Sequence, residues 1–137
     1  MRILVIDGQG GKIGKLLIEG VKEKLPQAEI TAIGTNSIAT TNMLKAGPDQ
    51  AATGENPVIV SSKTADVIVG PIGIVVADAL VGEITAEMAV AVGRSRAKKV
   101  LIPLNKCDTV IPGVMPLSMS ELVSQAIDQI EKEAVCG

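Results

Sequence analysis

A glycine-rich segment near the start of the chain, residues 8–14, has the residue types that bind phosphate groups. It follows an apolar run at residues 2–6 and leads into a helical pattern at residues 12–24, so we expect a strand, a loop and a helix N-terminus. Glycine lets backbone N–H groups approach a ligand closely, and a helix N-terminus directs unpaired N–H donors to the same place. The predicted phosphate-binding residues are Gly8, Gln9, Gly10, Gly11, Lys12, Ile13 and Gly14.

The spacing of Gly8, Gly11 and Gly14 resembles the loop of the extended and atypical short-chain dehydrogenases. In that group the loop holds the pyrophosphate of NAD or NADP, so the resemblance implies one of these as the cofactor. The likeness covers only the first strand–helix–strand unit. The chain contains no tyrosine and lacks the Tyr-x-x-x-Lys pair of the group, which excludes hydride transfer by its mechanism. A tight turn whose glycines serve packing alone is the alternative.

A second interpretation of the same loop comes from GTPases. Residues 10–15 resemble a phosphate-binding P-loop, and Asn105-Lys106-Cys107-Asp108 matches the Asn-Lys-x-Asp pattern that reads guanine. However, Gln9 stands where the P-loop needs its first glycine, and Leu16 replaces the hydroxyl that would bind magnesium. The GTPase interpretation therefore lacks the P-loop residues that would bind phosphate and magnesium. Residues 105–108 more simply end a strand and begin a turn.

Two further loops should reach the same crevice, because ligands of parallel sheets bind at the carboxyl ends of the strands. After the second predicted strand come Thr35, Asn36 and Ser37, which we expect near a ribose or, for Ser37 above all, as the cap of the next helix. The acidic residue that holds the ribose in many NAD sites is missing there. After the fourth predicted strand come Gly70, Pro71, Ile72 and Gly73, which either line the ligand or make a sharp turn.

Few residue types in this chain can transfer protons. Histidine, phenylalanine, tyrosine and tryptophan do not occur, which excludes Ser-His-Asp and Cys-His catalysis and histidine metal sites within one chain. Two cysteines cannot form a four-thiolate site, so we predict no metal. The candidates for acid–base work are Asp7, Lys12, Glu55 and Lys106, whereas Cys107 is more typical of a small buried hydrophobic residue than of a nucleophile.

The composition predicts a well-folded globular protein with one domain, residues 1–137. The net charge is -2 and the 13 basic residues are scattered, which argues against a nucleic-acid partner. The apolar stretch at residues 67–82 is short and interrupted by Pro71 and Asp78, so we expect no membrane span. Two lone cysteines and the absence of a signal-peptide pattern favour the cytoplasm, and the apolar segment 72–92 favours a homo-oligomer.

Strands and helices are expected to alternate along the chain. Strands are predicted at residues 2–6, 29–33, 58–60, 66–69 and 99–104, and helices at 12–24, 38–46, 74–80, 85–92 and 118–133. Residues 52–57 are predicted to form a polar turn. Continuous apolar strands that alternate with helices are typical of a parallel sheet covered on both faces. We therefore predict an α/β fold, a Rossmann-like three-layer α/β/α sandwich with a five-stranded parallel sheet.

Over nearly its whole length the chain resembles a family of short, stand-alone bacterial proteins classed as a domain of unknown function. The residues that carry this likeness lie at 5–11, 34–36, 52–56, 69–73 and 102–105. The resemblance supports the boundaries and implies no activity. From the glycine loop we predict a protein that binds a nucleotide or dinucleotide, with an NAD(P)-type ligand favoured. The alternatives are a small enzyme acting on a phosphorylated or acidic metabolite, and a structural or regulatory homo-oligomeric subunit without ligand.

Overall fold

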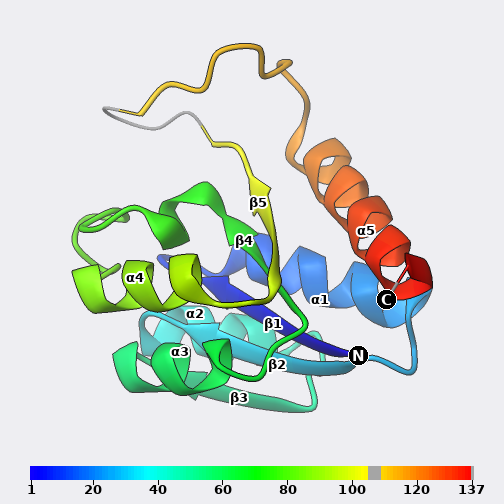
Figure 1. Cartoon of the computed structure of the whole chain (residues 1–137), viewed down its shortest axis with the longest axis horizontal. Helices are drawn as coiled ribbons and strands as arrows, with labels where there is room; N and C mark the ends of the chain where they lie inside the picture. Colours follow the sequence, from blue (N-terminus) through cyan, green and yellow to red (C-terminus); the bar gives the residue numbers. More distant parts are fainter. Residues whose placement is uncertain (105–108, 137) are drawn as a thin grey trace.

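The computed structural model describes residues 1–104 and 109–136, in which strands and helices alternate (Figure 1). The strands are β1 (Arg2–Asp7), β2 (Glu29–Gly34), β3 (Gln50–Thr53), β4 (Val67–Pro71) and β5 (Lys98–Ile102). The helices are α1 (Lys12–Lys24), α2 (Ser37–Leu44), α3 (Glu55–Ser62), α4 (Ala86–Arg94) and α5 (Met119–Cys136), with a short 3-10 helix, η1, at Ile72–Val75.

The strands form one parallel sheet in the order β3-β2-β1-β4-β5. From β1 the chain moves outward through β2 and β3, and it then returns to the other side of β1 for β4 and β5. The strand order therefore reverses between β1 and β4. In open α/β sheets, ligands bind at the carboxyl ends of the strands beside such a reversal. This arrangement confirms the predicted Rossmann-like fold and places the glycine loop, which follows β1, beside the reversal.

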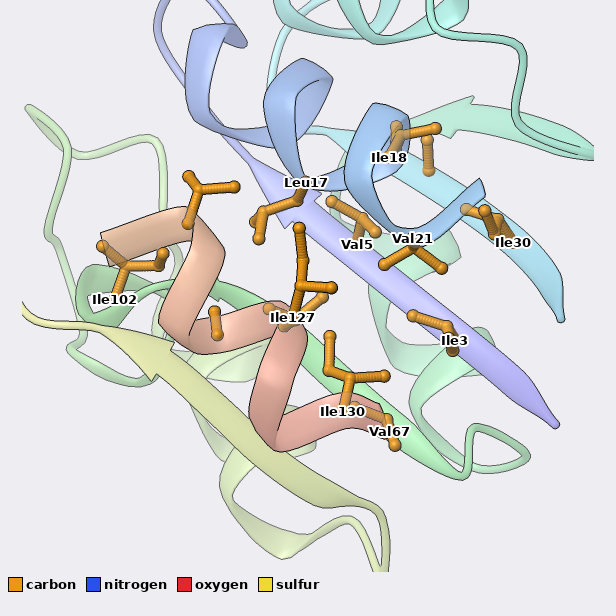
Figure 2. Close-up of a cluster of buried hydrophobic side chains, with 14 of the residues drawn as sticks. Ile3, Val5, Leu17, Ile18, Val21, Ile30, Val67, Ile102, Ile127 and Ile130 are labelled. Atoms are coloured by element: carbon orange, nitrogen blue, oxygen red, sulfur yellow. The ribbon is translucent and has the colours of Figure 1, made fainter. Parts of the chain in front are cut away.

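Two hydrophobic cores lie on opposite faces of the sheet. In β1, Ile3 and Val5 pack on one face with α1 and α5, whereas Leu4 and Ile6 pack on the other with α3 and α4. Figure 2 shows the first core, in which side chains of α1 and α5 converge over the sheet. Aliphatic side chains and methionine fill both cores, as a chain without aromatic residues requires. Helices on both faces complete the three layers.

One predicted strand is wrong. Residues 58–60 lie in α3, and the third strand is instead β3, which begins before the predicted polar turn. A short apolar run is compatible with a buried strand or with one side of a helix. Here Val58 is buried and Val60 is 54% exposed, and Glu55 in the first turn of α3 favours a helix at this point. The edge strand β3 is only partly buried, so its sequence carries little apolar signal.

The helix expected at residues 74–80 is also wrong. The 3-10 helix η1 ends at Val75, and residues 76–84 continue as turns. Asp78, Leu80 and Val81 have positive φ angles of 66°, 57° and 56°, so the backbone leaves helical geometry there. Of the helices that do form in the described residues, none is long and apolar enough to cross a membrane.

Candidate functional site

The glycine loop makes a tight connection between β1 and α1 at the strand-order reversal. Gly11 N donates to Gly8 O at 2.9 Å, and Gln9 and Gly11 have positive φ angles of 50° and 72°. Gly11 also lies against α2, because a Cβ at this position would be 2.6 Å from Ala39 O. A left-handed conformation and a close backbone neighbour together require glycine at position 11.

Packing accounts for all three glycines of the dehydrogenase-like spacing. Besides Gly11, a Cβ at Gly8 would lie 2.6 Å from Thr35 Oγ1, and one at Gly14 would overlap the side chain of Met43. Gly10 differs, because no atom lies within 4 Å of the place where its Cβ would be. The spacing of residues 8, 11 and 14 therefore needs no ligand to explain it, and Gly10 is the glycine of this loop that faces open space.

The carboxylate of Asp7, at the end of β1, occupies the N-terminus of α1. It is 4% exposed and accepts hydrogen bonds from Gly8 N at 2.8 Å and Gly14 N at 2.7 Å, with Ile13 N–H as a further donor. Burial raises the pKa of Asp7, these backbone donors offset part of the rise, and repulsion by Glu83 adds to it. The first turn of α1 has no acidic residue, so Asp7 supplies the negative charge that this end of the helix favours.

A second carboxylate, that of Glu83, reaches the loop from the turns between η1 and α4. Its Oε1 accepts hydrogen bonds from Gln9 N at 2.8 Å, Thr35 Oγ1 at 2.5 Å and Asn36 Nδ2 at 3.0 Å. Burial works to raise the pKa of Glu83, but these three donors outweigh it, and the pKa is lowered. Three of the predicted binding residues thus hold one carboxylate oxygen of the protein itself, and this place therefore accommodates an anionic oxygen.

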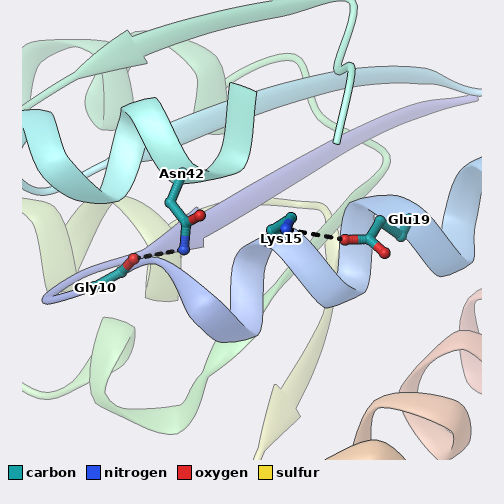
Figure 3. Close-up of polar contacts among 4 residues, drawn as sticks. All are labelled: Gly10, Lys15, Glu19 and Asn42. Carbon is teal, nitrogen blue, oxygen red and sulfur yellow. Dashed lines mark hydrogen bonds and ion pairs between the residues drawn. The ribbon is translucent and has the colours of Figure 1, made fainter. Parts of the chain in front are cut away.

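Two N–H groups of the loop remain available to a ligand. In residues 1–104 and 109–136, the backbone N–H groups of Gly10 and Lys12 have no protein acceptor. Lys12 is exposed and forms no ion pair with another described residue, whereas Lys15 pairs along α1 with Glu19 at 3.9 Å (Figure 3). A lysine at the positive end of a helix is unfavourable on its own, and an anion bound there would offset its charge.

The cap of α2 is Asn36, and not Ser37 as expected. The Oδ1 of Asn36 accepts from Ala39 N at 2.8 Å, and Ser37 is the first helical residue. Ser37 uses its carbonyl to accept from Thr41 Oγ1 at 2.8 Å. Asparagine and serine both cap helices well, so the sequence alone did not separate these two adjacent positions.

Two asparagines hold the carbonyl groups of the glycine loop. Asn36 Nδ2 donates to Gln9 O at 3.0 Å, in addition to its bond to Glu83. From within α2, Asn42 Nδ2 donates to Gly10 O at 2.9 Å (Figure 3). These bonds hold the carbonyl groups of the loop against the start and the middle of α2 and so fix the orientation of its peptide groups.

The predicted residues after β4 approach the loop, but Leu80 lies between the two segments. Gly70 and Pro71 are buried at the end of β4, and Ile72 begins η1. Leu80 Cδ1 is 2.7 Å from the place of a Cβ at Gly8, and Leu80 Cδ2 is 3.7 Å from the place of a Cβ at Gly73. The Leu80 side chain therefore lies between Gly8 of the loop and Gly73 of η1.

The candidates for proton transfer are placed in different surroundings. Asp7 is engaged by backbone donors, and Glu55 at the start of α3 accepts from Thr85 Oγ1 at 2.5 Å. Residues 105–108, which include Lys106, Cys107 and the GTPase-like motif, lie outside the described residues. Within the described residues, no group of three or more histidine, cysteine, aspartate or glutamate side chains could hold a metal ion.

Comparison with protein families gives a match over residues 2–135 to DUF3842, a domain of unknown function. The chain belongs to this family. Comparison with curated proteins gave no match to this DUF3842 chain. Among solved structures, it is similar to a dodecameric FMN-dependent UbiX-like decarboxylase from Escherichia coli O157:H7, with 19% sequence identity, a TM-score of 0.51, and coverage of 98% of this chain and 77% of that chain. At this identity the likeness shows the fold alone.

Sequence reasoning missed two residues at this site of the DUF3842 chain, Glu83 and Asn42. Glu83 is 74 positions away from Gln9, and only the tertiary fold brings them together. The available signal was its position after the fourth predicted strand, whose carboxyl end faces the loop. Asn42 stands inside a helical pattern, where an exposed polar residue carries no signal of its contact with Gly10.

Proposed function

We propose that this DUF3842 protein binds a nucleotide or dinucleotide, with an NAD(P)-type ligand favoured, through a phosphate group at the glycine loop. The observation that carries the proposal is the pair of backbone N–H groups of Gly10 and Lys12, which have no acceptor in the described residues. They lie in the same loop as Gln9, which with Thr35 and Asn36 holds one oxygen of Glu83. A phosphate oxygen accepts the same kinds of hydrogen bond as a carboxylate oxygen. The open N–H groups of Gly10 and Lys12 extend this donor set, and the Lys12 ammonium group adds positive charge.

The rest of the ligand would rest on small polar and aliphatic groups. Ser37, which follows Thr35 and Asn36 after β2, would lie near a ribose, which binds at this place in dinucleotide-binding folds. A base would contact aliphatic side chains and backbone, since the chain has no aromatic residue. The FMN dependence of the decarboxylase with a similar fold supports adding FMN to the ligands tested. Because the carboxylates of Asp7 and Glu83 both serve as acceptors of structural hydrogen bonds, no catalytic step is part of the proposal.

Titration calorimetry with NAD, NADP, ATP, GTP and FMN tests this function, together with one loop variant and one control. Gly11→Glu is unsuitable, because its backbone conformation and the contact with Ala39 would disturb the fold. Gly10→Glu adds a carboxylate to the loop without such a clash, and Gly93→Glu adds one to an equally open position on α4.

We expect at least one of these nucleotides to bind the wild type, and to bind Gly10→Glu at least about tenfold more weakly, a loss of about 1.4 kcal/mol. Gly93→Glu should bind like the wild type. If the wild type binds none of the five ligands, or if Gly10→Glu binds as well as the wild type does, the proposed function is wrong.

We also infer a homo-oligomer, because large apolar side chains are exposed beyond the carboxyl ends of β4 and β5. Val81 is 94% exposed, Val110 is 75% exposed and Met115 is 68% exposed. Exposed apolar groups of this size favour contact with another protein surface. The decarboxylase with a similar fold is a dodecamer, which supports the same inference.

A further inference from the structure

Residues 76–84, between η1 and α4, form a self-contained segment that we call the strap. Its backbone is held by its own hydrogen bonds, from Asp78 N to Ile84 O at 2.7 Å and from Ile84 N to Ala79 O at 3.1 Å. Ile74 before the strap and Ile84 at its end are buried in the second core. Val81 near its tip is 94% exposed. The strap is therefore a preformed loop, drawn in green in Figure 1, that is anchored at both ends and exposed at its tip.

The strap contacts the glycine loop through Leu80 and Glu83. Leu80 lies over Gly8, with its Cδ1 2.7 Å from the place of a Cβ there. Leu80 and Val81 have left-handed backbone conformations, which L-residues with large side chains adopt at a cost. Strained segments of this kind are typical of switch regions and ligand clamps. The strap thus places the Glu83 carboxylate on the loop, and the backbone of Leu80 and Val81 in the strap adopts an unfavourable left-handed conformation.

We propose that Glu83 is an internal occupant of the anion-binding place, and that the phosphate of a ligand binds there only after this carboxylate has left. The inference rests on the proposed function, because it concerns the same phosphate and the same donors. In the structure, Glu83 accepts the hydrogen bonds of Gln9, Thr35 and Asn36. In the bound state the phosphate takes over these donors, and the strap moves away from the loop.

The number of donor hydrogens around Glu83 means that a phosphate must replace its carboxylate and cannot bind in addition to it. Gln9 N and Thr35 Oγ1 each have one hydrogen to donate, and both hydrogens go to Glu83 Oε1. Asn36 Nδ2 has two hydrogens, and it donates to Glu83 and to Gln9 O. All the hydrogens of these three donors are in use. A phosphate oxygen can therefore use them only by displacing the carboxylate.

The charges at the site lead to the same conclusion. Asp7 is a buried carboxyl group beneath the loop, and Glu83 repels its charged form. A phosphate placed beside both groups would meet negative charge from two sides. A phosphate that replaces Glu83 removes one of these repulsions and keeps the open N–H groups of Gly10 and Lys12 as additional donors.

Removal of the carboxylate should therefore strengthen binding. We would titrate wild type, Glu83→Ala and Glu83→Gln with NAD, NADP, ATP, GTP, FMN and inorganic pyrophosphate, the last of which separates a bare phosphate from a nucleotide. A matched control is Asp78→Asn, which removes one charge from the same strap at a position of positive φ that asparagine tolerates. If the strap covers the site about 90% of the time, Glu83→Ala should bind about tenfold more tightly, while Asp78→Asn should bind like the wild type.

A measurement on the unaltered protein covers the case in which Glu83→Ala fails to fold. Carbon-13 NMR follows the titration of the Glu83 side chain, assigned with Glu83→Gln, in the free protein and in protein saturated with a ligand that binds. Displacement into solvent removes the three donors, so the pKa of Glu83 should rise toward its ordinary value when ligand is bound. This rise should persist at about 0.5 M salt, because salt screens the repulsion that a phosphate bound beside an undisplaced Glu83 would exert. A pKa that stays low or falls further means that Glu83 keeps its hydrogen-bond donors and remains in place.

The outcomes separate this inference from the function on which it rests. Tighter binding by Glu83→Ala, or the rise in the pKa of Glu83, supports the exchange. Equal or weaker binding by a folded Glu83→Ala, or a low pKa in the complex, overturns the exchange and leaves the proposed nucleotide binding intact. Binding of pyrophosphate but of no nucleotide supports the exchange and overturns the proposed ligand class. If no probe binds the wild type, the proposed function and the exchange are both wrong.

Discussion

At the scale of residues, two carboxylates meet the glycine loop in different ways. Asp7 is buried and accepts from one backbone N–H group before α1 and one within its first turn. Glu83 is partly exposed and accepts from one backbone group and two side chains. Their pKa values move in opposite directions, because burial prevails at Asp7 and hydrogen bonding prevails at Glu83. Asp7 therefore belongs to the fold, whereas Glu83 holds the place that we propose for a phosphate.

The raised pKa of Asp7 gives a pH dependence of stability with a definite sign. The folded protein binds the Asp7 proton more tightly than the unfolded chain does, so the contribution of Asp7 to stability falls as the pH rises above 3.8 through the folded pKa. Asp7→Asn cannot ionise. In urea denaturation from pH 3.5 upward, we expect the free energy of unfolding of Asp7→Asn, relative to wild type, to increase with pH. A relative value that decreases with pH would contradict this assignment.

Glu83→Gln provides a contrast within the same site. The lowered pKa of Glu83 means that its contribution to stability is present above pH 4.5 and is lost as the pH falls through the folded pKa. The stability advantage of the wild type over Glu83→Gln should therefore shrink below pH 4.5. We expect this advantage to be less than about 1 kcal/mol even at neutral pH, because the group is partly exposed and solvent screens its charge.

The position of the glycine loop could be predicted, whereas the contacts of its residues could not. Glycine spacing after an apolar strand was enough to place a strand–helix connection after residue 7. The sequence could not show that packing alone explains Gly8, Gly11 and Gly14, because their neighbours come from α2 and the strap. It could not show Glu83 either, since the strap follows no regular pattern and its contact spans 74 positions.

At the scale of elements, the close approach of α1 and α2 determines the shape of the loop. Gly11 precedes α1 with a φ angle of 72°, and the backbone of Ala39 leaves no room for a side chain there. Gly10, one residue earlier, has open space around it. Glycine at position 11 is therefore required by the fold, whereas glycine at position 10 faces open space.

We expect Gly11→Ala to destabilise the protein by about 2 kcal/mol or more, through its left-handed backbone and the collision with Ala39 O. Gly10→Ala serves as the control and should stay within about 0.5 kcal/mol of wild type. Urea denaturation monitored by circular dichroism measures both. Equal stability of the two variants would show that α1 and α2 do not approach each other at Gly11.

The helices and strands were predicted correctly where the pattern of apolar residues in the sequence was strong. The amphipathic pattern of α1 and the apolar runs of β1, β2 and β4 were sufficient. Residues 58–60 were wrongly predicted as a strand, because a short apolar run fits a strand as well as a helix. Tertiary packing of Val58 decided between the two. The partly buried edge strand β3 gave too weak a pattern to correct the error.

At the scale of the whole molecule, the sheet order brings the loop after β1 beside the segments that follow β2 and β4. The same carboxyl side carries the exposed side chains of Val81, Val110 and Met115. An interface there would lie next to the strap. Light scattering at high protein concentration should therefore show a species larger than a monomer, and Val110→Asp with Met115→Asp should shift it toward the monomer. A monodisperse monomer of wild type would contradict the homo-oligomer.

The central claim is that the glycine loop receives the phosphate of a nucleotide at its two open N–H groups. Nitrogen-15 NMR tests it most directly, by titrating labelled wild-type protein with each nucleotide and following every backbone amide. We predict that the amide signals of Gly10 and Lys12 show large, saturable shifts, since these donors have no protein acceptor in the described residues. Saturable shifts centred elsewhere in the molecule, with Gly10 and Lys12 unmoved, would contradict the account.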